Sequence, residues 1–236
     1  MAYKLTDDAP MNINNLSYKS WLMISLLPLM LNQPVIASAT TSVSYYIDDR
    51  DFNSITLQLS AADLPQDFSV WGFTDFLGDQ SHHDERKDFT RTFSEYRLSN
   101  SKLSKLTGID GLGLQIEYDD ATPNYNNTIW RSGLTYKHKL NGKHWLQLRA
   151  MPLQNNKDRQ ISLIYFASIM PRLNISGFAD YNIRHGNGNQ WVIEPQLNFR
   201  LLNKTWLLLE YRHNGFEQDN INLDGKGWAI GIRYDL

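Results

Sequence analysis

The stretch Trp228-Ala229-Ile230-Gly231-Ile232-Arg233-Tyr234-Asp235-Leu236 decides the fold, because its residues alternate in polarity from one position to the next. One face is apolar and the other carries small and charged residues: Trp228, Ile230, Ile232, Tyr234 and Leu236 against Ala229, Gly231, Arg233 and Asp235. A period of two is that of a β-strand with one apolar face. The sequence therefore predicts a strand that ends at Leu236.

The same alternation recurs at 128–140, 173–184 and 191–201, with Phe178 as an apolar exception on a polar face. These segments run to about ten to thirteen residues, whereas strands of soluble proteins average about five to six. A tilted strand that crosses a membrane needs about 9–11 residues. The lengths favour a transmembrane barrel over a soluble sandwich, whose strands would also alternate.

The connections between these segments alternate in length. From the C-terminus backwards, long or moderate connections at 216–226, 185–190, 155–158 and 120–127 alternate with short ones at 203–204, 171–172 and 141–142. Bacterial outer-membrane barrels have short periplasmic turns, longer external loops and an even number of strands. The segment 101–111 breaks the pattern, because its parity predicts a short turn and it is long.

We predict an all-β fold, a transmembrane antiparallel up-and-down β-barrel of twelve strands, with ten strands as the alternative. Ten segments alternate clearly, 54–62 is weaker and 42–48 is doubtful; an even count then requires both or neither. The expected strands are 42–48, 54–62, 69–79, 90–100, 112–120, 128–140, 143–154, 159–169, 173–185, 190–202, 205–215 and 227–236.

The first residues resemble an export signal. Trp21 to Leu31 is an apolar-rich run of eleven residues, too short for a membrane helix of about 20. Lys19 precedes the run and small residues at Ala37 and Ala39 follow it, as in a secretory signal peptide. We expect residues 1–39 to be this peptide, with a possible start at Met11, and residues 40–236 to form a barrel in the outer membrane of a Gram-negative bacterium.

Composition removes several classes of function. A net charge of −2 excludes a general electrostatic affinity for nucleic acid, and the absence of cysteine excludes disulfides, thiolate nucleophiles and cysteine-bound metals. We expect no cofactor, no metal and no enzyme activity, since no Gly-x-Ser-x-Gly motif accompanies the histidines. His82-His83-Asp84-Glu85 reads as a solvated charged loop, and the external loops 80–89, 120–127 and 216–226 could also serve as an interaction surface.

The polar faces of the strands carry charges of both signs in similar number. Two interpretations stay open: a salt-bridge network that plugs the barrel, leaving a structural or surface-interaction protein, and a narrow polar channel for a neutral solute. The segment 71–76 favours the channel, because Trp71 and Phe73 share a face with Asp75. Aromatic rings beside a carboxylate suit a ligand with a flat ring and hydroxyl groups, such as a nucleoside. The alternative is that this face meets lipid.

Three stretches resemble the Tsx family of nucleoside-specific outer-membrane channels and the related OmpK-type porins: WGFTDF at 71–76, SEYRLSNSKLSKLTG at 94–108 and GKGWAIGIRYDL at 225–236. The chain departs from the family in being shorter and in ending with Leu236 instead of an aromatic residue. The resemblance implies twelve strands, nucleoside uptake and a KLTG-type periplasmic turn at 105–108, which would account for the long segment 101–111.

We expect the partners to be nucleosides or similar small polar solutes, outer-membrane lipid and the barrel assembly machinery. The candidate substrate-binding residues all have inward parity: Trp71, Phe73, Asp75, Glu95, Arg97, Glu117, Arg131, Glu194, Arg200, Glu210 and Arg212.

Overall fold

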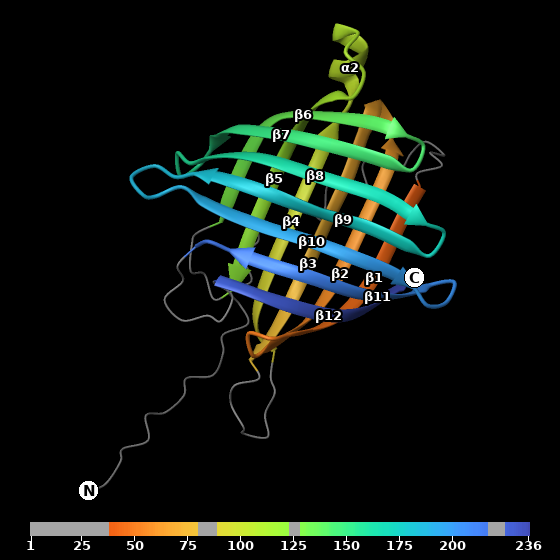
Figure 1. Ribbon diagram of the computed structural model, residues 1–236. Helices are drawn as coiled ribbons and strands as arrows, with labels where there is room; N and C mark the ends of the chain where they lie inside the picture. Colours follow the sequence, from red (N-terminus) through yellow and green to blue (C-terminus); the bar gives the residue numbers. More distant parts are fainter. Residues whose placement is uncertain (1–37, 80–88, 123–127, 217–224) are drawn as a thin grey trace, which may run out of the picture. The chain divides into compact units, whose positions relative to one another are not determined.

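A computed structural model describes residues 38–79, 89–122, 128–216 and 225–236, which form a closed antiparallel β-barrel (Figure 1). Each strand pairs with the next along the chain, and β12 pairs with β1 to close the cylinder. No helix among the described residues has the length and apolarity that a membrane crossing requires. The twelve-stranded prediction is confirmed and the ten-stranded alternative is wrong.

The strands are ten to thirteen residues long, as the alternation predicts. Their bounds are β1 Ser38–Asp48, β2 Phe52–Leu64, β3 Phe68–Asp79, β4 Phe89–Asn100, β5 Leu112–Thr122, β6 Ile129–Asn141, β7 His144–Gln154, β8 Arg159–Met170, β9 Leu173–Ile183, β10 Gln190–Arg200, β11 Thr205–Asn214 and β12 Gly225–Asp235.

The strand that the sequence left doubtful, β1, is a full-length strand of 11 residues. It pairs along its whole length with β2 and over seven positions with β12, from Ser42 opposite Asp235 to Asp48 opposite Ala229. Its pattern is hard to read in the sequence because threonine and tyrosine occupy both faces. The strand is therefore recognised by its pairing with β2 and β12 and not by its own alternation.

Burial alternates along the strands in the predicted phase. In β12, Trp228, Ile230 and Ile232 are about half exposed, at 53%, 52% and 54%, whereas Ala229 is fully buried. Residues directly opposite each other on paired strands share a face, so the pairings carry this phase around the barrel. The outer face is largely apolar, and most charged side chains of the strands turn inward; Asp120 and Arg159, near the ends of their strands, have outward parity.

The two ends of the barrel have connections of different length. At the end that we call the short-turn end, the connections are 65–67, 101–111, 142–143, 171–172 and 201–204; at the other, the long-loop end, they are 49–51, 80–88, 123–128, 155–158, 184–189 and 215–224. The connection 49–51 is an exception in its length. There the Arg50 backbone N–H donates to Asp48 Oδ1 at 3.0 Å, and Asp51 adopts a left-handed φ of 64°.

The long segment 101–111 folds as a compact helical turn and not as a loop. Helix α2, Lys102–Thr107, ends at Gly108, whose φ of 73° is the left-handed conformation that glycine adopts without strain. Lys105 forms an ion pair with Asp67 in the neighbouring connection. Figure 1 shows this helix at the rim of the barrel.

Four parts of the chain lie outside the described residues: 1–37, 80–88, 123–127 and 217–224. The expected signal peptide falls almost entirely in the first of them, and the external loops and the His82 to Glu85 run fall in the others. These expectations stay predictions.

Candidate functional site

The lumen of the barrel contains a first ion network, which we define as Glu95, Arg97, Glu117, Asp119, Arg131, Arg149 and Asp180. Glu117, with 1% of its side chain exposed, lies at its centre. Arg131 Nη1 donates to Glu117 Oε1 at 2.7 Å and Arg149 Nη1 to Oε2 at 2.7 Å, while Arg97 Nε lies 3.1 Å from Oε2. Three guanidinium groups from three strands thus meet at one carboxylate.

Each of these guanidinium groups also contacts a second carboxylate. Arg97 pairs with Glu95, Arg131 pairs with Asp119, and Arg149 Nη2 donates to Asp180 Oδ1 at 3.3 Å. Shared contacts of this kind offset the cost of removing the charges from water. The first ion network is therefore a cross-linked, nearly neutral section of the wall that spans β4 to β9.

The carboxylate oxygens of Glu95, Glu117 and Asp119 lie within 4.8 Å of one another, a spacing at which three carboxylates can hold a cation. In this barrel the guanidinium groups of the first ion network already contact all three carboxylates. The positive charge that such a cluster needs is thus supplied by arginine, and the cluster supports no metal site.

A second ion network lies on the other side of the lumen and consists of Asp48, Arg50, Glu210 and Arg212. Arg50 Nη2 lies 2.8 Å from Asp48 Oδ2, Arg212 Nη1 lies 3.2 Å from the same oxygen, and Arg212 also pairs with Glu210. Gln196 of β10 extends it along the same part of the wall, since its Nε2 donates to Tyr46 Oη on β1 at 2.8 Å and to Glu210 Oε2 on β11 at 2.6 Å.

Two further carboxylates adjoin the second ion network without an arginine of their own. Asp75 accepts a hydrogen bond of 2.5 Å from Thr56 Oγ1. Glu194 interacts electrostatically with Glu210 and Arg212 but forms no hydrogen bond or ion pair with the described residues. This side of the lumen therefore contains more carboxyl groups than guanidinium groups.

Trp71 and Phe73 turn into the lumen with the residues paired to them, Arg97 and Glu95, so the alternative that this face meets lipid is wrong. The Trp71 and Phe73 rings meet edge to face at 5.4 Å between centroids, and Phe93 lies 5.7 Å from Phe73. The Arg97 guanidinium lies over the Trp71 ring at 4.2 Å, an arrangement that fixes a guanidinium beside an aromatic surface.

The glycine between these two rings has a steric role on the outer face. A Cβ at Gly72 would lie 2.8 Å from the backbone oxygen of Glu95 and would meet the Tyr96 ring. Tyr96 can lie flat over this position only because glycine occupies it. The aromatic-Gly-aromatic pattern thus places two rings inside and leaves room for a third outside.

Two lumen tryptophans lie towards the short-turn end, as their inward parity predicts. Trp206 is 5% exposed, has the guanidinium groups of Arg200 and Arg233 over its ring at 4.5 and 5.0 Å, and donates from Nε1 to Asp235 Oδ2 at 2.8 Å. At Trp145 the ammonium of Lys137 lies 4.2 Å from the ring centroid.

The structure brings the predicted residues together in two groups and leaves one apart. Trp71, Phe73, Glu95, Arg97, Glu117 and Arg131 form one group, whereas Glu194, Glu210 and Arg212 form the other. Asp75 adjoins both, because it lies on β3 two residues from Phe73 and interacts with Glu210 and Arg212. Arg200 joins neither group, because it lies at the end of β10 over Trp206.

The sequence prediction missed Asp48, Arg50 and Tyr46 as lumen residues. All three come from β1 or the turn that follows it, where the strand itself was doubtful. The signal that could have found Asp48 and Tyr46 is their shared parity with Ser42 and Ser44 on one face of a strand.

No protein-family model matches the sequence, and no curated protein matches it. Among solved structures, the chain is similar to the KdgM porin, with a TM-score of 0.52 and 11% identity over 83% of this chain and 98% of that one. A structure of KdgM porin in complex with disordered oligogalacturonate gives a TM-score of 0.52 at 12% identity over the same shares. The NanC porin gives a TM-score of 0.56 at 8% identity, over 83% of this chain and all of that one.

At these identities the similarity concerns the fold. The specific resemblance to the Tsx family, drawn from three short stretches, is not confirmed by any of these comparisons. The chain therefore shares the closed antiparallel barrel of porins.

Proposed function

We propose that this protein is a channel of the bacterial outer membrane for small, uncharged, hydrogen-bonding solutes, with nucleosides as the substrate class. The short-turn end faces the periplasm, as in outer-membrane barrels generally. Residues 1–39 act as the export signal; cleavage after Ala39 removes two terminal residues of β1 and leaves the rest of that strand paired.

The observation that carries the proposal is the pairing of the lumen charges at positions that solvent still reaches. The side chains of Arg97, Glu95 and Arg212 are 16%, 13% and 13% exposed although each is ion-paired. Rings of one charge select ions of the opposite sign. A wall in which most charges are paired with the opposite sign attracts an ion less than a wall of one sign would, and it offers many hydrogen-bonding groups to a neutral solute.

The aromatic pair supports nucleosides within that class. Stacking of a base on an aromatic side chain is worth about 1–3 kcal/mol in single-stranded nucleic-acid sites. In our proposal Trp71 and Phe73 provide the apolar surface, while Glu95, Arg97 and Asp75 bind the polar groups of the solute. Modest affinity is sufficient, because a conducted solute must also leave.

The deep burial of the centre of the first ion network favours a second candidate, a plugged barrel that acts as a structural or surface-interaction protein. Glu117 and Arg149 each have only 1% of the side chain exposed. A third outcome, transport of acidic saccharides, is suggested by the similar KdgM porin, whose complex holds disordered oligogalacturonate. Transport of an acidic saccharide would require cationic side chains without ion pairs inside the lumen.

Single-channel currents in planar bilayers test these alternatives, with adenosine, glucose and galacturonate as probes. Adenosine should reduce the wild-type current at lower concentration than the two sugars do. The double variant Trp71→Ala/Phe73→Ala should keep its conductance and require at least about tenfold more adenosine, given the stacking energies above.

The matched control is Tyr118→Ala/Trp130→Ala, which removes an aromatic pair at 4.7 Å on the outer face. It should leave the adenosine response unchanged. A barrel that never conducts would be the plugged form, a conductance that no nucleoside reduces would be a general pore, and stronger block by galacturonate would indicate an acidic substrate.

A further inference from the structure

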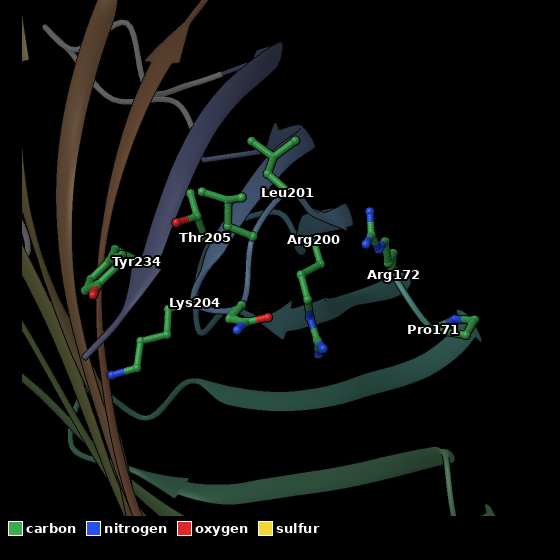
Figure 2. A pocket seen from close by; sticks show the side chains of 9 residues that line it. Pro171, Arg172, Arg200, Leu201, Lys204, Thr205 and Tyr234 are labelled. Atoms are coloured by element: carbon green, nitrogen blue, oxygen red, sulfur yellow. The ribbon is translucent and has the colours of Figure 1, made fainter.

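A cleft of about 700 Å³ opens at the short-turn end of the barrel, between the β8–β9 turn, the β10–β11 turn and the end of β12. Three basic side chains line it, Arg172, Arg200 and Lys204. Figure 2 shows Arg200 at the end of β10, Lys204 on the β10–β11 connection and Arg172 on the adjacent turn.

Backbone hydrogen bonds assemble the cleft from three separate segments. The N–H of Arg200 donates to the carbonyl oxygen of Arg172 at 2.8 Å, which joins the two turns. The N–H of Asp235 donates to the carbonyl oxygen of Lys204 at 2.9 Å, which joins the β10–β11 turn to β12. Main-chain contacts thus bring the three segments that carry the basic side chains to one cleft.

These cations lack the partners that the lumen arginines have. Within the described residues none of the three forms an ion pair, and no carboxylate lines the cleft. The adjacent carboxylate, Asp235, accepts from Arg233 Nε at 3.0 Å and from Trp206 Nε1 at 2.8 Å. Arg200 stacks on the lumen residue Trp206 at 4.5 Å, so Arg172 and Lys204 are the two cations that we assign to an anion.

The cleft adjoins the apolar outer surface. Leu201, Leu202 and Tyr234 line it and are 43%, 69% and 45% exposed. Leu201 and Tyr234 continue the outward rows of their strands, which include Phe199 and Ile232. Basic and aromatic side chains at the end of an apolar band mark the depth of the lipid headgroups.

We propose that this cleft binds the phosphodiester headgroup of an anionic phospholipid in the periplasmic leaflet, with the leucines and Tyr234 against the start of its acyl chains. Guanidinium and ammonium groups recognise phosphate oxygens through charge-assisted hydrogen bonds. The site requires that the barrel span a membrane, but it does not depend on the proposed conduction.

Native mass spectrometry of the full barrel in detergent micelles that contain phosphatidylglycerol or phosphatidylcholine tests the proposal. The wild type should retain one phosphatidylglycerol in preference to phosphatidylcholine. The double variant Arg172→Gln/Lys204→Gln should bind phosphatidylglycerol about thirtyfold more weakly, since each basic side chain near an anionic lipid surface contributes about fivefold.

The control Lys143→Gln/Lys226→Gln changes the net charge equally at two exposed lysines outside the cleft. It should bind lipid as the wild type does. Equal retention by the cleft variant, or equal loss in the control, would overturn the site. If inorganic phosphate at equal concentration displaced the lipid, the lipid would not be the specific ligand of the cleft. Heat-modifiability on gels, unchanged from the wild type, would show that each variant folds.

Discussion

The two ion networks of the lumen differ in how their charges are shared. In the first ion network every guanidinium contacts two carboxylates, and Glu117 receives three guanidinium groups. Beside the second ion network, Glu194 has no direct partner among the described residues and Asp75 is held by a threonine hydroxyl. On the first side of the wall every carboxylate is thus paired with a guanidinium group, whereas the second side includes two carboxylates without an ion pair.

The difference implies different roles. Removing one member of a buried ion pair leaves its partner uncompensated and is strongly destabilising, while removing an unpartnered charge costs little. We therefore expect the first side to hold the barrel together and the second side to tolerate substitution.

The largest expected effect follows from removing a shared guanidinium. Arg149→Met should lower the free energy of unfolding by about 3–5 kcal/mol, because Glu117 and Asp180 lose a common partner inside the barrel. Denaturant titration of barrels folded into lipid vesicles measures this loss. The control is Lys157→Met, at an exposed position of the β7–β8 connection, which should change the free energy of unfolding little. If Arg149→Met lowered that free energy by less than about 1 kcal/mol, the network would not be what stabilises this wall.

An intermediate effect tests the facing of β10, on which the second side depends. Arginine on a lipid-facing position costs about 2–4 kcal/mol at the bilayer midplane and less towards the surfaces. Leu197 is 41% exposed on the outer face. The variant Leu197→Arg should therefore be less stable in the membrane than the wild type by about 2 kcal/mol. Gln196→Arg, one residue away on the inner face, should fold nearly as well as wild type. Folding yields into vesicles measure both, and equal yields would mean that the facing is misassigned.

The smallest effect is expected at Glu194. Glu194→Gln should change the free energy of unfolding by no more than about 0.5 kcal/mol, since this carboxylate has no described partner and faces Glu210. The same change at the centre of the first ion network, Glu117→Gln, should cost about 1–3 kcal/mol. The same denaturant titrations compare the two, and a similar cost at both positions would remove the distinction between the two sides of the lumen.

Much of the barrel could be predicted from local pattern. Period-two alternation in β9, β10 and β12 indicates a strand with a lipid face, because an apolar outward residue must follow every inward one. The prediction of strands and turns was weaker where this alternation is absent. In β1 polar residues occupy both faces, and in 101–111 the length of a connection gave no indication that its backbone closes into helix α2.

The candidate site was predictable only as a set of inward residues. Parity along each strand assigned Trp71, Glu117 and Glu210 to the lumen, but parity does not say which charges meet. Arg149 reaches Glu117 across one intervening strand, and Gln196 reaches Tyr46 across two. Such contacts depend on strand register and barrel closure, which couple residues far apart in sequence.

The sequence by itself determined the class of fold, the length of the strands and the face on which most charged residues lie, because these properties follow from a repeat of two residues. Only the tertiary structure decided how the charges divide into a shared network and a set of carboxylates without an ion pair, and that Arg172 and Lys204 from two turns line one cleft with Tyr234. The physical reason is that electrostatic pairing depends on distances of a few ångströms, and those distances are fixed only when β12 pairs with β1 and closes the cylinder.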